Sequence, residues 1–227
     1  MSDILGRINP QFIVILYRVP VLLLSFMTHE LAHAFTAYRC GDNTAKEMGR
    51  ISFNPIRHID PIGAILLLAV GFGWAKPVPI NPDNFRKKKA GIILTSLAGP
   101  LSNILLAIIF SSVYVIFMSN AVSPYAQMTD AQMVARNLLI QFYVINITLA
   151  AFNLIPIPPL DGSKVVFSLL PDRIYYGYIL RYERYGMFLL IGLSITGILS
   201  TILTPVINYV SDFVNMVIVP LTAPFIK

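Results

Sequence analysis

Long apolar runs separated by short polar loops make up most of this sequence. A helix needs about 20 mostly apolar residues to cross a lipid bilayer. Runs of about that length cover residues 12–38, 90–118, 134–156 and 186–204. We predict a membrane-spanning helix for each of these four runs.

Two further apolar segments are ambiguous. Residues 61–74, PIGAILLLAVGFGW, are short for a span and predict a short or re-entrant helix. Residues 205–224 are long enough, but Pro205 leaves almost no turn after the preceding run. They predict either a sixth span or a helix at the membrane interface. The predicted fold class is therefore an all-α polytopic membrane protein with about five to six transmembrane or re-entrant helices.

Two stretches outside the four predicted spans have strand rather than helix character. They are GRISFNP (49–55) and WAKPVPIN (74–81), and both are bounded by Gly, Pro or Asn. They predict a small cytoplasmic-side β-hairpin or sheet. Because no polar stretch is long enough for an independent soluble domain, residues 1–227 are predicted to form a single membrane-embedded domain.

Composition agrees with a membrane protein. The chain is 56% hydrophobic and 12% charged, whereas soluble domains are about 25% charged. The net charge of +6 fits Lys and Arg on cytoplasmic loops and does not require a nucleic-acid partner. The first apolar run contains Arg18 and no small-residue cleavage site follows it closely, so we interpret it as a retained helix and not as a signal peptide.

Basic residues predict the orientation. Lys and Arg occur in the segments 39–60, 75–89 and 157–185, but none occurs between residues 119 and 133. The positive-inside rule places the first three segments in the cytoplasm and the last one outside. This arrangement predicts a multi-pass protein of the cell (plasma) membrane, and the short loops favour a prokaryotic source.

The polar sequence HELAH interrupts the end of the first apolar run. On a helix, His29 and His33 lie one turn apart on one face, so both imidazoles can bind one metal ion. Glu30 stands beside them as a candidate general base, and zinc is a metal that imidazole binds readily. The alternative is a pair of buried histidines that are hydrogen-bonded to backbone or other polar groups.

A catalytic zinc usually has three protein ligands. Asp161, in NLIPIPPLDGSKV, is predicted at the same end of the membrane as the histidines. Its alternative role is the N-cap of the segment that follows. His58 is a second candidate ligand, although we expect it to pack or hydrogen-bond within its own loop.

Five motifs occur in order over about residues 25–170: HELAH, GRISFNPIRHIDPIG, GWAKPVPIN, LAGPLSN and NLIPIPPLDG. Together they resemble the site-2 protease family of intramembrane zinc metalloproteases, in a minimal branch without PDZ or CBS domains. The resemblance implies that His29, His33 and Asp161 bind one Zn²⁺ per chain. It also implies that Glu30 is catalytic and that Asn153 acts near the scissile carbonyl.

Asn103, Asn146 and Asn153 lie in apolar runs. An Asn amide can donate a hydrogen bond to a developing oxyanion, but Asn in membrane helices commonly bonds one helix to another. We favour the catalytic role for Asn153 only, and helix–helix bonding for Asn103 and Asn146.

The predicted function is hydrolysis of peptide bonds in or near transmembrane segments of membrane-protein substrates, as in regulated intramembrane proteolysis. Partners are the transmembrane substrate and membrane lipid, with no nucleic acid. Because His29 precedes Arg39 by ten residues, the site is expected within about 15 Å of the cytoplasmic boundary, in that half of the bilayer. The alternative is a non-enzymatic metal-binding or transport protein, which would need ligands along a path through the membrane.

Overall fold

The computed structural model describes residues 10–61, 63, 76–122, 127–171 and 185–226, with side chains from Tyr17 onward. In chain order the elements are α2 (Pro10–Cys40), α3 (Thr44–Glu47), the 3-10 helices η1 (Pro55–His58) and η2 (Pro82–Asn84), α5 (Lys88–Ala121), α6 (Asp130–Leu154), α7 (Asp161–Ser168), a helix over Tyr185–Ile195, α9 (Ile198–Thr222) and the 3-10 helix η3 (Ala223–Phe225).

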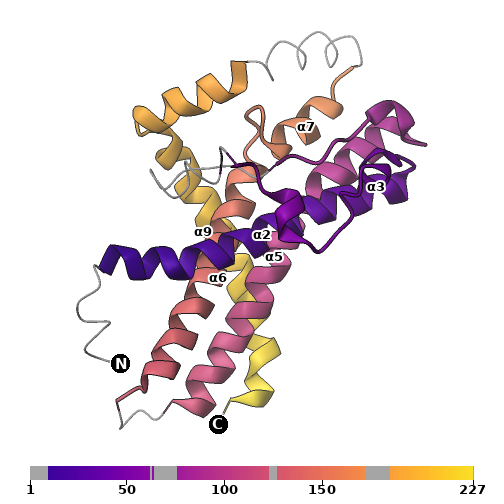
Figure 1. Cartoon of the computed structure of the whole chain (residues 1–227). Helices are drawn as coiled ribbons and strands as arrows, with labels where there is room; N and C mark the ends of the chain where they lie inside the picture. Colours follow the sequence, from indigo (N-terminus) through magenta and orange to yellow (C-terminus); the bar gives the residue numbers. More distant parts are fainter. Residues whose placement is uncertain (1–9, 62, 64–75, 123–126, 172–184, 227) are drawn as a thin grey trace.

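Three helices form the main bundle. Within the described residues, α5, α6 and the stretch Ile198–Phe225 that contains α9 are long and apolar enough to cross a membrane. They pack on one another around a core of small and β-branched side chains: Ala107, Ile147, Ala150, Ala151, Val210, Val214 and Ile218. Small residues let helix backbones approach closely, which favours association in lipid. In the view of Figure 1, α2 runs across this bundle, and it contacts α5 and α6.

Three of the four predicted helices occur near their expected positions. The run 12–38 lies within α2, a helix of 31 residues with Pro20 inside it. The run 90–118 lies within α5, and the run 134–156 begins inside α6. Helix α6 ends at Leu154 because Ile155 precedes a proline and adopts an extended conformation.

The prediction of a span over 186–204 is wrong. Gly197 has φ of 75°, a left-handed conformation that separates the helix Tyr185–Ile195 from α9. Over its described residues, Tyr185–Ile195, the first of these helices is too short to span a bilayer. The long helix is instead α9, which begins at Ile198 and continues through Pro205, since membrane helices tolerate an interior proline.

The predicted β-hairpin is not formed in the described residues. Residues 49–55 consist of turns, bends and the start of η1, and residues 76–81 are irregular. Side chains bond several backbone groups of residues 76–81: Glu30 accepts the Val78 N–H, Arg50 donates to the carbonyls of Lys76 and Pro77, and Asp42 accepts the Asn81 N–H. The Lys76 N–H donates to the backbone carbonyl of His58 at 2.9 Å. Pro77 and Pro79 have no N–H to offer a partner strand.

The segment 61–74 lies outside the described residues except for Pro61 and Gly63. The predicted total of five to six transmembrane or re-entrant helices is therefore not confirmed: the described part of the chain contains three candidate spans.

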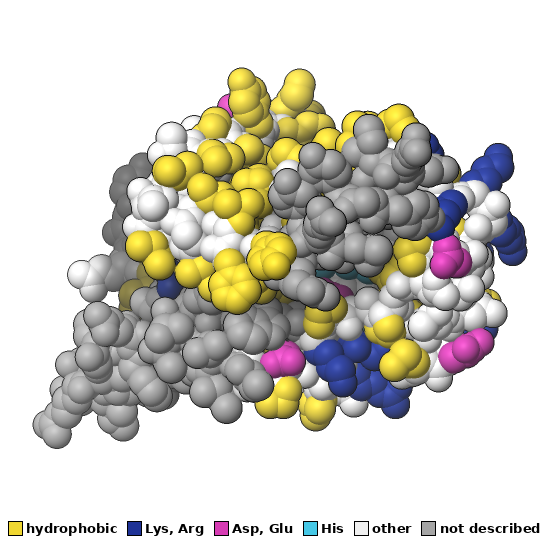
Figure 2. Space-filling view, turned by 90° about the horizontal axis from the view of Figure 1, so that it is seen from above, with side chains coloured by type: hydrophobic (Ala, Val, Ile, Leu, Met, Phe, Trp, Pro, Cys, Tyr) yellow, Lys and Arg dark blue, Asp and Glu magenta, His cyan; other side chains and the backbone are white. Residues whose placement is uncertain are grey.

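The loops gather at two opposite ends of the bundle. At one end the Arg86 N–H donates to Cys40 O, and Lys89 Nζ donates to Leu170 O, which brings the ends of α2 and α7 to the start of α5. At the other end Asn120 Nδ2 donates to Phe225 O. Seen from above in Figure 2, most of the visible Lys and Arg side chains lie toward the right and lower side, with some hydrophobic side chains among them, and a larger group of hydrophobic side chains lies toward the upper left.

Candidate metal centre

Two histidines and one aspartate meet at the crossing of α2 with α5 and α7. His29 and His33 are one helical turn apart, and their Nε2 atoms are 3.0 Å from each other. Asp161 Oδ2 lies 3.2 Å from His29 Nε2 and 3.0 Å from His33 Nε2. All three side chains are buried, and they form the only group of His, Cys, Asp or Glu in the described residues that could hold a metal ion.

The Nδ1 atom of each imidazole already has a hydrogen-bond partner in the protein. His33 Nδ1 lies 2.7 Å from the carbonyl oxygen of Thr95, which can only accept, so this nitrogen carries the proton. His29 Nδ1 lies 2.6 Å from Oδ1 of Asn103 and donates to it. Both Nε2 atoms therefore direct lone pairs toward the centre, which is the tautomer that metal-binding histidines need.

The tautomer of His29 depends on the orientations of the Asn103 and Asn146 side-chain amides, and the backbone carbonyl of Phe142 fixes both orientations. Phe142 O can only accept, so the atom of Asn146 that faces it at 2.9 Å is Nδ2. Asn146 Oδ1 then accepts from Asn103 Nδ2 at 2.8 Å, and this leaves Asn103 Oδ1 facing His29. Ser25 completes the buried chain, because its hydroxyl oxygen accepts from Asn146 Nδ2 at 2.9 Å.

The centre fits a zinc ion. Two nitrogen lone pairs and a carboxylate oxygen converge without a donor between them, an arrangement that a cation stabilises. A tetrahedral Zn²⁺ with bonds of about 2.0 Å places its ligand atoms about 3.3 Å apart, close to the 3.0–3.2 Å found here. Two histidines and one carboxylate are also a ligand set of catalytic zinc sites, which leave a fourth position open.

Gly99 of α5 provides the space that the imidazoles occupy. A Cβ at this position would lie 2.6 Å from His29 Nε2, and closer still to His33 Nε2. No real Cβ tolerates such contacts with two buried rings. Gly99 belongs to the motif LAGPLSN, so this motif makes room for the two imidazoles.

Asp161 is the first residue of α7 and not its N-cap, which is Leu160. The N-cap alternative is therefore wrong. The carboxylate faces the histidines through Oδ2, while Lys164 Nζ lies 3.3 Å from Oδ1. Gly162 lets α7 approach α6, because a Cβ there would lie 2.7 Å from Ile155 O.

Glu30 is held by the segment that was predicted as a strand. Its Oε2 accepts a hydrogen bond of 2.9 Å from the Val78 N–H. Buried Arg50 holds this segment through Nη2 to Lys76 O at 2.6 Å and Nη1 to Pro77 O at 3.1 Å. Burial lowers the pKa of Arg50, and the negative charge of Glu30 opposes that effect.

The structure does not bring the other two candidates into the group. His58 is buried in its own loop, where Nε2 donates to Ser52 O at 2.8 Å. Asn153 donates from Nδ2 to Leu149 O at 3.0 Å, one turn earlier on α6. Among the described residues, neither side chain bonds to His29, His33 or Asp161.

The sequence of the chain matches a known protein family. The chain matches the model of Peptidase family M50 over residues 17–195. The chain belongs to peptidase family M50.

This M50 peptidase has relatives in bacteria and archaea. It is 40% identical to YwhC of Bacillus subtilis over 85% of this chain and 86% of YwhC. It is 30% identical to MJ0611 of Methanocaldococcus jannaschii over 69% of this chain and 73% of MJ0611. Both relatives are assigned by name to the zinc metalloproteases. No solved structure is significantly similar to the chain.

Membership of M50 confirms the resemblance to the site-2 protease family. The protein is an intramembrane zinc metalloprotease that acts on membrane-protein substrates, and a non-enzymatic metal transporter is not favoured.

Sequence reasoning missed the contact that Asn103 makes in this M50 peptidase. Asn103 was expected to bond helices together, and it does so through Asn146, but it also orients His29. The spacing of Asn103 and Gly99 is the sequence feature that relates to this contact. Asn103 follows Gly99 by four residues and therefore lies on the same face of α5.

Proposed function

We propose that His29, His33 and Asp161 bind one Zn²⁺ per chain and that Glu30 is the general base of peptide-bond hydrolysis. The observation that carries this proposal is the convergence of the two Nε2 atoms with Asp161 Oδ2, at 3.0–3.2 Å, while both Nδ1 protons are engaged elsewhere. We further propose that residues 1–227 work as a single membrane-embedded domain.

A bound Zn²⁺ would polarise the scissile carbonyl and lower the pKa of a water molecule. Glu30 would take a proton from the attacking water as the water oxygen bonds to the carbonyl carbon. The same carboxyl group would then give that proton to the leaving nitrogen as the C–N bond breaks. The Val78 N–H is bonded to Oε2, so it would keep the Glu30 carboxylate in one orientation through both transfers.

Asn153 is proposed to donate a hydrogen bond to the substrate carbonyl oxygen as it gains negative charge. Its side chain is partly exposed, and among the described residues its amide is bonded only to a carbonyl of its own helix. A substrate oxygen that carries developing charge would compete well with this neutral acceptor.

The site is proposed to open to the cytoplasm of a prokaryotic plasma membrane. On α5, Thr95 and Asn103 follow Lys88 by 7 and 15 residues, which corresponds to about 10 and 22 Å along the helix. The site thus lies in the half of α5 nearer its basic end, and basic ends face the cytoplasm. Substrates would be cut in the same half of their membrane segment, at residues that weaken the helix.

The test compares zinc content and cleavage of transmembrane peptides between the native chain and Glu30→Gln. We expect the native chain to hold one zinc and to cut. Glu30→Gln should retain the zinc and lose cleavage, because it removes a base and not a ligand. Glu47→Gln, at an exposed position of α3, is the matched control and should cut normally.

Near-native hydrolysis by Glu30→Gln would disprove the role of this residue. Full zinc content in Asp161→Ala would disprove the proposed ligand set.

A further inference from the structure

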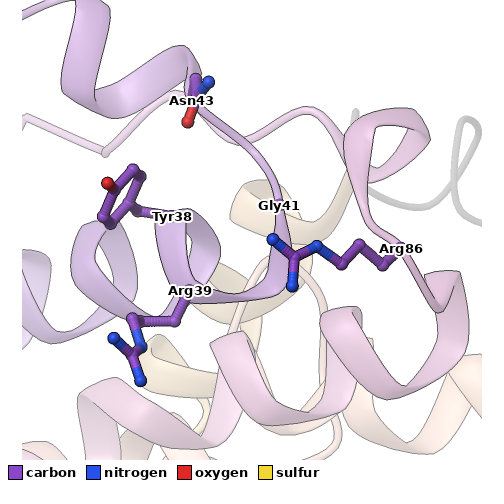
Figure 3. Close-up of a pocket in the computed structure, with 5 residues that line it drawn as sticks. All are labelled: Tyr38, Arg39, Gly41, Asn43 and Arg86. Carbon is purple, nitrogen blue, oxygen red and sulfur yellow. The ribbon is translucent and has the colours of Figure 1, made fainter.

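A hollow lies at the basic end of the molecule, apart from the metal centre. It has a volume of about 530 Å³ and is lined by Tyr38, Arg39, Gly41, Asn43 and Arg86. Figure 3 shows these residues around the turn that follows α2, with Arg86 reaching toward the chain at Gly41. The lining contains two guanidinium groups and no carboxylate.

The walls of the hollow are fixed by contacts that involve no ligand. The Arg86 N–H donates to Cys40 O at 3.0 Å. Gly41 has φ of 115°, and a Cβ there would lie 3.1 Å from Arg86 Cγ, so only glycine allows this close approach. Buried Asp42 accepts from the Asn81 N–H at 2.7 Å and from Asn84 Nδ2 at 2.9 Å. The hollow is therefore preformed.

Within the part of the chain that the structure describes, the two guanidinium groups have no counter-charge. Among the described residues, the side chains of Arg39 and Arg86 make no hydrogen bond or ion pair. Other basic side chains nearby are engaged: Lys88 pairs with Asp83, and Lys46 Nζ donates to Tyr38 OH at 3.1 Å. Two unpaired arginines that line one hollow attract an anion, and the guanidinium fork matches a phosphate group.

The position of the hollow favours a lipid as the source of that phosphate. Arg39 lies in the last turn of α2, and Arg86 comes two residues before α5, a candidate membrane span. A membrane boundary at the start of α5 would place both arginines near the level of the lipid phosphates. Phe35, one turn before Arg39 on the same face of α2, is 53% exposed. An acyl chain below a bound headgroup would cover this ring.

We propose that this hollow binds the phosphate group of an anionic phospholipid, with Arg39 and Arg86 as its main ligands and the Asn43 amide as a further donor. The bound headgroup would join the end of α2, which carries His29 and Glu30, to the segment that contains Val78. An anionic lipid would thereby stabilise the arrangement around Glu30. The binding itself requires neither zinc nor catalytic turnover.

The test measures lipid binding and thermal stability of the full chain in nanodiscs. One set contains phosphatidylcholine alone, and the other contains phosphatidylcholine with phosphatidylglycerol. We expect phosphatidylglycerol to raise the Tm of the native chain, and native mass spectrometry to show retained phosphatidylglycerol. Arg39→Gln and Arg86→Gln should each weaken this retention about tenfold, as expected for loss of a charge-assisted hydrogen bond.

Lys87→Gln is the matched control, because it removes one charge from the same basic block at a residue that does not line the hollow. It should retain phosphatidylglycerol like the native chain. An equal loss in Lys87→Gln would show attraction by diffuse charge and would overturn the proposal, as would equal Tm values in the two nanodiscs. If the glutamine variants fail to fold, Arg39→Lys and Arg86→Lys replace them, because these variants keep the charge. Both should retain less phosphatidylglycerol than the native chain.

Inorganic phosphate, added to the chain in phosphatidylcholine nanodiscs, distinguishes the two sources of phosphate. We expect it to have little effect on the Tm. A rise that matches phosphatidylglycerol and disappears in the double arginine variant would support the phosphate site but overturn its assignment to a lipid.

Discussion

Asn103 Oδ1 lies 2.6 Å from Nδ1 of His29. This contact joins two helices, α5 and α2, and it makes the tautomer of one proposed zinc ligand depend on a side chain of the neighbouring helix. His33 receives the same support from the backbone carbonyl of Thr95, at 2.7 Å. A single helix, α5, therefore positions both imidazoles.

The first prediction tests the role of Asn103. Asn103→Leu should lower zinc affinity about 10- to 100-fold, the usual effect of losing a partner of a metal-bound histidine. Asn103→Asp keeps an acceptor for His29 Nδ1 and should lose less. Zinc affinity is measured by competition with a chelator, and an unchanged affinity in Asn103→Leu would show that His29 does not need this partner.

The second prediction concerns the space at Gly99. Gly99→Ala places a methyl group 2.6 Å from His29 Nε2, so zinc content should fall well below one per chain and cleavage should be lost. Gly192→Ala is the control, because a Cβ at Gly192 would meet nothing within 4 Å. That variant should keep its zinc and gain about 0.5–1 kcal/mol of stability from reduced backbone entropy. Elemental analysis and the Tm measure both effects, and a Gly99→Ala protein with full zinc content would contradict the geometry.

The third prediction concerns pH and Asp42. Burial acts to raise the pKa of this carboxyl group, but hydrogen bonds from Thr44, Asn84 and the Asn81 N–H outweigh it and hold the pKa below its usual value of 3.8. A carboxyl group with a lowered pKa stabilises the folded state at higher pH, and the stabilisation is lost as the pH falls below the unfolded-state pKa toward the folded-state pKa. The Tm difference between the native chain and Asp42→Asn should therefore be constant near neutral pH and should shrink below about pH 4. A difference that persists at the lowest pH would show that the carboxylate charge is not what stabilises this turn.

The fourth prediction concerns orientation. In a Cys40→Ala background, a cysteine at position 47 should react with an impermeant thiol reagent only from the cytoplasmic side. A cysteine at position 127 should react only from outside. Residue 47 follows the end of α2 beside the start of α5, and residue 127 precedes α6 at the opposite end. Labelling of position 47 from outside would reverse the orientation and place the metal centre in the other half of the bilayer.

Helical periodicity was sufficient to pair His29 with His33, because residues four apart share a face wherever the chain is helical. Asp161 is separated from His33 by 128 residues, and the sequence could only suggest that both lie at the same end of the membrane. The folded chain brings them to 3.0 Å through the packing of α7 against α5. Local spacing determines contacts within one helix, whereas contacts between helices depend on crossing geometry.

Apolar content determined where α2, α5 and α6 lie, because burial in lipid requires long apolar helices. It could not locate the break at Gly197, since a left-handed glycine leaves the hydrophobicity of its neighbourhood unchanged. The strand pattern of residues 76–81 was also a local signal, and tertiary structure overrode it. The side chains of Glu30, Arg50 and Asp42 bind the backbone groups that a hairpin would have used. Sequence therefore determined helices α2, α5 and α6 and the pairing of His29 with His33, while the packing of distant side chains decided which groups surround them.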